Sequence, residues 1–183
     1  MKRQKFIEGS FVEIQLSDTK KAIGRLLPNF ELRVYNKVFE SSENVDLDDL
    51  VNQEIFFEVG IFKWVITKGY FSVIGYKELS EAENANRKPK FWQDKYDMNN
   101  CILLYPDGRE ENVTPQECVG LESTGAFDDI GVVKRINDHL NGNKFYYGFF
   151  NNLIRKTDAP NGGKVIPEHF FNFPEGKWPP IEN

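Results

Sequence analysis

The chain has 183 residues and a formal net charge of −5, with 40% apolar, 14% aromatic and 28% charged residues. This length fits one domain, with or without an added tail, and the apolar content is sufficient for a core. A negative surface disfavours nonspecific binding to nucleic acids and to anionic lipids, whereas it speeds association with a basic protein. The composition therefore argues against a nonspecific nucleic-acid or membrane binder.

The cysteines and the N-terminus indicate a compartment. Cys101 and Cys118 are too few for a disulfide-stabilised secreted domain, so we expect a reducing compartment in which both thiols are small buried groups. No apolar run follows the basic N-terminal residues, and no apolar stretch approaches the roughly 18 residues that a membrane helix needs. We expect a cytoplasmic protein without a signal peptide or a membrane span.

The N-terminal residues predict three strands. Residues 11–16 and 22–27 are rich in β-forming side chains and flank a polar turn, which predicts a hairpin. Gly24 inside the second strand indicates a bulge or a close approach of two backbones. After a break at Pro28, residues 32–39 predict a third strand.

A short helix and three more strands are expected next. Asp46 is placed to cap the helix, and further carboxylates follow in the first turn, where the helix dipole favours them. Residues 55–59, 63–67 and 70–76 are nearly continuous apolar runs, which predict strands buried on both faces.

The following polar stretch, residues 78–90, ends in a Pro-containing segment and predicts a long loop. Residues 101–105 and 109–113 flank an Asp-Gly pair at Asp107, which predicts a hairpin.

Two helix starts are predicted after this hairpin. Thr114, with Pro at the next position and Glu117 three residues later, matches a capping box, so a helix of little more than one turn is expected there. The main helix is expected to begin near Asp128 or Asp129 and to stop at Asn141. Its predicted apolar face consists of Ile130, Val133, Ile136 and Leu140.

These elements predict an α+β fold: a strongly bent, mainly antiparallel and partly barrel-like sheet, one principal C-terminal helix and short capped helices. We expect residues 1–147 to form a single domain and residues 148–183 to form an aromatic- and proline-rich extension packed on it.

No catalytic or metal-binding motif stands out. His139 and His169 are thirty residues apart, and neither lies at metal-ligand spacing from a cysteine. We therefore expect no metal, and a structural or capping role for His139. Gly162-Gly163-Lys164 lacks the upstream glycine of a P-loop and indicates a turn. The acidic pairs beside helix starts and a hairpin fit solvated or capping carboxylates better than glycosidic acid–base chemistry. We therefore expect no cofactor and no enzyme activity.

The order of several segments resembles the immunity protein 26 (Imm26) family of bacterial polymorphic toxin systems. These segments are 9–16, 23–25, 71–75, 117–122 and 132–139, and the resemblance extends over roughly residues 5–147. It implies a cytoplasmic antidote that inhibits a cognate toxin domain by stoichiometric binding, without catalysis, nucleic acid or membrane; the oligomeric state stays open. Many toxin domains are basic nucleases, which an acidic partner would capture quickly, so a nuclease is one candidate toxin class.

Five carboxylates are our candidate partner-binding residues, with aromatic side chains at the rim as anchors. They are Asp46, Asp48, Asp49, Asp128 and Asp129. The alternative for each one alone is that it only caps a helix.

A second group of residues from the resembling segments is assigned to maintenance of the fold: Gly24, Arg25, Gly120, Leu121 and Glu122. Two other functions stay open. A nucleic-acid-binding small β-barrel would show a basic surface stripe, and an enzyme on an unfamiliar α+β scaffold would show a deep pocket with convergent titratable groups.

Overall fold

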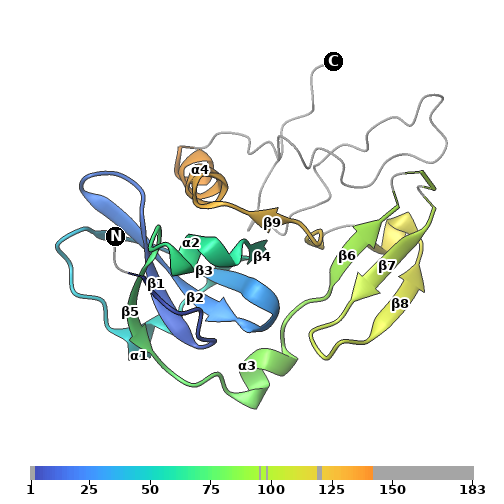
Figure 1. Cartoon of the computed structure of the whole chain (residues 1–183), viewed down its shortest axis with the longest axis horizontal. Coiled ribbons are helices and arrows are strands. Elements are labelled where there is room, and N and C mark those ends of the chain that lie inside the picture. Colours follow the sequence, from blue (N-terminus) through green and yellow to red (C-terminus); the bar gives the residue numbers. More distant parts are fainter. Residues whose placement is uncertain (1–2, 95, 98, 119–120, 142–183) are drawn as a thin grey trace. The chain divides into compact units, whose positions relative to one another are not determined.

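The computed structural model describes residues 3–94, 96–97, 99–118 and 121–141 (Figure 1). They form two compact units. Unit 1 contains residues 3–80 and 125–141, and unit 2 contains the described residues of 81–124. Gly120, His169, the Gly162-Gly163-Lys164 segment and the predicted extension 148–183 lie outside the described residues, and the division into one domain and an extension stays a prediction.

Unit 1 holds a six-stranded sheet, called sheet A, in the strand order β5-β1-β2-β3-β4-β9. The strands pair antiparallel except for β4 with β9, which are parallel. The bounds of the elements of unit 1 are β1 (Ser10–Gln15), β2 (Lys20–Leu27), η1 (Pro28–Phe30), β3 (Glu31–Glu40), α1 (Leu47–Leu50), β4 (Ile55–Ile61), α2 (Lys63–Thr67), β5 (Ser72–Tyr76), β9 (Ala126–Phe127) and α4 (Asp129–Leu140).

The predicted hairpin, bulge and third strand are confirmed in sheet A. β1 pairs with β2 across the polar turn, and the pairing of β2 with β3 shifts register between Ala22 and Gly24. A Cβ on Gly24 would lie 2.6 Å from Leu32 Cδ1 and 3.0 Å from the Arg33 carbonyl oxygen. The glycine is therefore required by the close approach of β3, as a mid-strand glycine often indicates.

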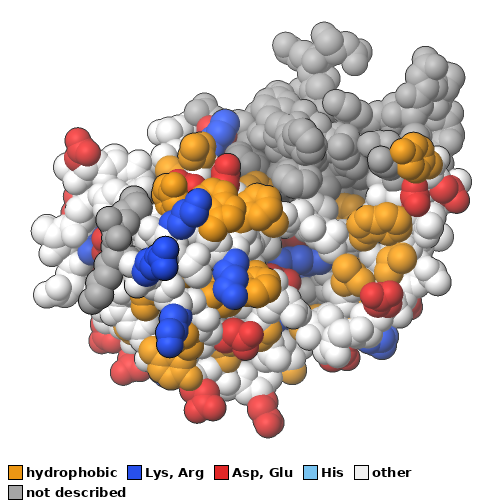
Figure 2. All heavy atoms as spheres, viewed as in Figure 1, with side chains coloured by type: hydrophobic (Ala, Val, Ile, Leu, Met, Phe, Trp, Pro, Cys, Tyr) orange, Lys and Arg blue, Asp and Glu red, His pale blue; other side chains and the backbone are white. Residues whose placement is uncertain are grey.

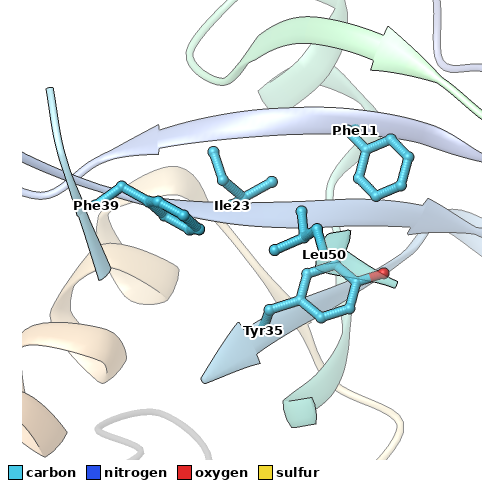
Figure 3. Packing of buried hydrophobic residues seen from close by; sticks show 5 residues of the cluster. All are labelled: Phe11, Ile23, Tyr35, Phe39 and Leu50. Atoms are coloured by element: carbon cyan, nitrogen blue, oxygen red, sulfur yellow. The ribbon is translucent and has the colours of Figure 1, made fainter. Parts of the chain in front are cut away.

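One face of sheet A carries a cluster of buried side chains that also seats α1 (Figure 3). Phe11, Ile23, Tyr35 and Phe39 from three strands surround Leu50 of α1. Leu50 is 1% exposed, and the partly buried Val45, Leu47 and Val51 pack against the same cluster. Apolar side chains on one side of this short helix therefore hold it on the sheet.

The opposite face of sheet A carries α4. Val34 and Tyr35 are consecutive in β3 and point to opposite faces, and Val34 pairs with Phe57 of β4. Phe57 therefore lies on the face away from α1, and Arg135 of α4 stacks over its ring with Cζ 4.0 Å from the centroid. Sheet A is thus covered by α1 on one face and by α4 on the other.

The predicted start of the main helix is confirmed, whereas its predicted apolar face is right at Ile136 and wrong at Ile130 and Leu140. The helix buries Val132, Arg135 and Ile136, whereas Ile130 is 71% and Leu140 48% exposed. A face predicted from apolar residues alone missed Arg135, which is buried with its guanidinium over the Phe57 ring. Long charged side chains can pack in this way and still count as polar in the sequence.

Residues 63–67 were predicted as a strand and instead form α2, a single helical turn. The Lys68 amide donates to the Trp64 carbonyl oxygen at 2.9 Å, and Gly69 follows with φ +81°, which is the usual stop for a helix. A short apolar run fits a strand or a buried turn of helix equally well, so its periodicity did not distinguish the two.

Two further expectations for the middle of the chain are corrected. β5 begins at Ser72, and its residues Val73, Ile74 and Tyr76 are exposed, so this edge strand is not buried on both faces. The stretch 78–90 is not entirely loop, because α3 forms within it.

Unit 2 holds a three-stranded antiparallel sheet, in the order β6-β7-β8. The predicted Asp-Gly hairpin joins β7 and β8 and is confirmed. Its core contains Phe91, Cys101, Leu103 and Cys118, with Leu121 packed against them. The bounds in unit 2 are α3 (Glu81–Ala85), β6 (Lys90–Gln93), β7 (Cys101–Leu104), β8 (Glu110–Val113) and η2 (Pro115–Cys118).

The architecture is the predicted α+β class, with mainly antiparallel sheets, short capped helices and one principal helix, α4, near the C-terminal end of the described residues. The Glu117 amide donates to the Thr114 carbonyl oxygen at 3.1 Å and not to the hydroxyl, so only the Glu117 half of the predicted capping box forms at the 3-10 helix η2. The Glu117 carboxylate accepts from the Thr114 amide and hydroxyl, both at 2.8 Å. These two bonds hold the pKa of Glu117 below its ordinary value.

Arg25 is, together with Arg135, the largest fully buried side chain of unit 1. Its guanidinium donates from Nη2 to the carbonyl oxygens of Lys77 and Glu78, at 2.8 and 3.0 Å, and lies over the Phe11 ring at 5.0 Å. The side chain thereby ties the segment after β5 to the centre of the sheet.

We expect Arg25→Met to lower the free energy of unfolding by about 3 kcal/mol or more, because two buried carbonyl oxygens lose their charged donor. Urea unfolding followed by tryptophan fluorescence measures the loss. The control Arg109→Met removes a guanidinium that is 58% exposed in the side chain and should cost less than about 1 kcal/mol. Equal losses in the two variants would contradict the structural role of Arg25.

Candidate functional site

Three of the five candidate carboxylates lie together on α1. Asp46 caps the helix and accepts from the amides of Asp48 and Asp49 at 2.9 and 3.3 Å. Asp48 forms an ion pair with Lys77 at 2.7 Å, and Asp49 accepts from the Gln53 side chain at 3.1 Å. The hydrogen bond from Lys77, followed by its charge, holds the pKa of Asp48 below its ordinary value.

The segment around α1 is strongly acidic. Residues 40–54 contain six Asp and Glu residues and no Lys or Arg. The side chains of Asp46, Asp48 and Asp49 are exposed, because Leu50 on the other side of the helix seats it on the sheet. This acidic segment presents a locally negative surface to an approaching partner.

Asp128 and Asp129 lie on α4 and do not join the acidic segment. Asp128 caps α4 by accepting from the Gly131 amide at 2.7 Å, and Asp129 follows in the first turn. Both are half-buried. Since α1 and α4 cover opposite faces of sheet A, the structure places the five carboxylates in two separate groups.

The residues assigned to the fold occupy structural positions in the two units. Gly24 and Arg25 lie at the centre of β2, as described above. In unit 2, Leu121 packs against the core, and the carbonyl oxygen of Glu122 accepts from the Phe91 amide at 2.9 Å.

Sequence reasoning missed a second surface of unit 1, which we call the aromatic–lysine surface. Its aromatic members are linked in two groups: Phe6 meets Phe30 edge-on at 5.1 Å, and Trp64 contacts Phe62 at 5.9 Å and Tyr70 at 5.4 Å. Figure 2 shows one face of the molecule, on which apolar side chains lie among lysine and arginine side chains, with some Asp and Glu side chains between them.

Two lysines complete the aromatic–lysine surface. Lys63 Nζ lies over the Phe30 ring at 5.3 Å, and Lys68 Nζ lies over the Trp64 ring at 5.4 Å. Such contacts between an ammonium and the face of a ring hold the positive charge at the surface. The sequence signal was present: residues 59–77 contain three lysines and no Asp or Glu. Interpreting residues 63–67 as a strand concealed it.

The two thiols lie in the core of unit 2 and are not disulfide-bonded. Burial raises the pKa of Cys101, and burial together with the charge of Cys101 raises the pKa of Cys118 to about 12. A thiol with such a pKa is almost wholly protonated at neutral pH, whereas a catalytic cysteine needs a thiolate.

His139 packs its ring against Phe56 in unit 1, with the ring centroids 4.3 Å apart. Burial and the nearby Arg135 hold its pKa below the ordinary value. No group of three or more metal-binding side chains gathers among the described residues. Within the same residues, every helix is too short or too polar to cross a membrane.

Comparison with known proteins bears on the first half of the chain. The family model described as immunity protein 26 matches residues 7–102, just over half of the chain. The chain belongs to the immunity protein 26 family. The match covers the three N-terminal segments of the resemblance and leaves 117–122 and 132–139 outside it. No curated protein and no solved structure matches the chain.

Family membership gives the protein an immunity role and a cognate toxin protein as its partner. The matched residues include the acidic segment and all of the aromatic–lysine surface except Phe6, since α1, η1 and α2 all fall between 7 and 102. β8, η2, β9 and α4, with Asp128 and Asp129 at the start of α4, lie beyond the match.

We expect Asp46→Ala and Asp128→Ala each to lower the free energy of unfolding by about 1 kcal/mol, because each removes the acceptor of a helix N-cap. Thermal and urea unfolding measure this. Asp46→Asn and Asp128→Asn keep the capping oxygen and should retain nearly all of the stability. If the Asn variants lose as much stability as the Ala variants, the charge of the Asp side chain, and not its cap hydrogen bond, stabilises these helices.

We expect both thiols of the native protein to resist alkylation at about pH 8, because at a pKa of about 12 only about one Cys118 in ten thousand carries the reactive thiolate. Mass spectrometry after treatment with iodoacetamide checks this, with urea-unfolded protein as the control that reacts at both positions. Rapid labelling of the native protein would show that unit 2 opens readily.

Proposed function

We propose that this protein neutralises a cognate toxin domain in the cytoplasm by forming a stoichiometric complex, without catalysis. The observation that carries the proposal is the match of residues 7–102 to immunity protein 26. The buried, protonated thiols support binding over cysteine chemistry, because their pKa is raised. The partner is a protein, and neither nucleic acid nor a membrane is required.

A nuclease is the toxin class that we propose. Nuclease domains carry basic surfaces that hold phosphates, and the acidic segment of this protein would draw such a surface in. The exposed carboxylates Asp46, Asp48 and Asp49 are the residues proposed to act in this way, with Asp128 and Asp129 as a second group on the other face.

The direct test is co-expression of the chain with the toxin domain encoded beside it, scored by growth and by co-purification. We expect rescue and a stable complex. In a titration of the purified proteins, residual toxin activity should fall linearly to zero at equal amounts, as expected for stoichiometric capture. Inactivation of many toxin molecules by one antidote molecule would instead indicate catalysis, and failure to rescue from a demonstrably toxic neighbour would contradict the proposal.

The nuclease class and the role of the acidic segment are tested by association kinetics. We expect the association rate to fall between about 20 and 150 mM salt, since screening shortens the reach of surface charges. The triple variant Asp46→Asn, Asp48→Asn, Asp49→Asn should associate several-fold more slowly and dissociate at the unchanged rate. The double variant Asp128→Asn, Asp129→Asn measures separately how much the second group of carboxylates contributes to the association rate. Salt-insensitive association would remove the steering argument.

A further inference from the structure

Unit 1 concentrates its exposed apolar side chains on one part of its surface. Unit 1 has ten exposed large apolar side chains among its described residues. Seven of them belong to the N-terminal segment, to η1 and to residues 62–76, and the other three are Ile55, Ile130 and Leu140. Phe30, Phe62 and Tyr70 of the aromatic–lysine surface are each 43–46% exposed. Ring contacts and the contact of Lys63 with Phe30 join the aromatic members into linked groups, and clustered apolar side chains mark an interaction site far more often than scattered ones do.

The backbone at Phe30 is held in an unfavourable conformation to display its ring. Asn29 and Phe30 have φ values of 64° and 58°, the left-handed region that a bulky side chain rarely occupies. The conformation places Phe30 against Phe6 and under Lys63, with almost half of the side chain exposed. Because such strain lowers stability, its presence at an exposed aromatic points to a role in binding rather than in the core.

Charge specifies the chemistry of the partner surface. Lys63 and Lys68 lie on the rings, Arg3 and Lys5 belong to the adjoining N-terminal segment, and no Asp or Glu occurs in residues 59–77. The adjoining carboxylates are Glu8 and Glu31, so positive side chains outnumber negative ones in these segments. A surface that combines apolar rings with a net positive charge complements a partner that offers apolar pockets bordered by carboxylates.

The ring geometry favours a protein partner over a single-stranded nucleic acid. Stacking of bases needs an open ring face, but Trp64 stacks on Phe62 at an interplanar angle of 11° and has Lys68 over its ring. The Phe30 ring has Lys63 over it in the same way. Aromatic edges with lysines beside them, in contrast, suit insertion into a protein surface, where Trp, Tyr and Phe act as anchors.

We propose that the aromatic–lysine surface is the contact face for the toxin, where Phe30, Phe62 and Trp64 fill apolar pockets and Lys63 and Lys68 meet toxin carboxylates. This inference rests on the proposed function and names the face of the protein that would bind the toxin. The acidic segment around α1 speeds the encounter, whereas the aromatic–lysine surface holds the complex. The two surfaces therefore control different rate constants.

The experiment measures binding of the full chain to a catalytically inactivated form of the toxin domain encoded beside it, by surface plasmon resonance. Phe30→Asn keeps a residue that tolerates the left-handed backbone and removes the ring. We expect it to dissociate at least about tenfold faster while its Tm stays the same or rises. Lys63→Glu with Lys68→Glu should weaken the affinity by about tenfold or more.

Matched controls come from other parts of unit 1. Lys37 lies over the Phe39 ring at 4.9 Å, so Lys37→Glu makes the same change of charge beside an aromatic ring that does not belong to the aromatic–lysine surface. Ile130→Asn removes an apolar side chain that is 71% exposed on α4. Both controls should bind within about twofold of the unsubstituted protein.

The outcomes separate the inference from the proposed function. If the unsubstituted chain binds and neutralises the toxin but the Phe30 and lysine variants bind equally well, the assigned face is wrong and the proposed function stands. If the unsubstituted chain does not bind, both fail. A fall in the Tm of Phe30→Asn with unchanged dissociation would assign the ring to packing on Phe6 and overturn its role as an anchor.

A labelled single-stranded oligonucleotide of about 20 nucleotides tests the other class of partner. Tight, salt-dependent binding that is lost in Lys63→Glu with Lys68→Glu would overturn the protein partner in favour of nucleic acid. We expect no such binding at about 150 mM salt, because a lysine lies over the Phe30 ring and another over the Trp64 ring, and the chain is acidic overall.

Discussion

The position of Arg25 is the constraint on which unit 1 depends. Its guanidinium is buried on the same face as Phe11 and donates to the carbonyl oxygens of Lys77 and Glu78. A buried charge is tolerated only with such partners, so the segment after β5 must return to this point of the sheet. Lys77 then reaches Asp48 on α1 with its side chain. One side chain in the middle of β2 therefore helps to position both the edge strand and the acidic helix.

Local signals in the sequence predicted the elements that depend on neighbours in the chain. The caps at Asp46 and Asp128 and the Asp-Gly hairpin are formed by residues within a few positions of one another, and all three were predicted. The conformation of residues 63–67 and the buried face of α4 depend on contacts with distant strands, such as that of Arg135 with Phe57. The prediction for residues 63–67 was wrong, and that for the face of α4 was right only at Ile136. Composition describes such contacts poorly, because an arginine counts as polar wherever it packs.

The net charge of −5 conceals a division of charge within unit 1. The acidic segment of residues 40–54 carries no cation, whereas residues 59–77 carry no carboxylate. The sequence allowed the acidic candidates to be named because carboxylates near helix starts are conspicuous. The aromatic–lysine surface was hidden, since its members come from three separate parts of the chain and meet only in the folded unit.

The strained backbone at Phe30 distinguishes the two surfaces. Each α1 carboxylate has an intramolecular role in capping, pairing or hydrogen bonding, so stability alone explains its presence. Phe30 has the opposite balance: its left-handed backbone costs stability, on the order of 1–3 kcal/mol, and the ring stays half exposed. Folding by itself would favour Gly or Asn at this turn. An aromatic residue held there against the preference of its backbone is more simply explained by a partner that binds it.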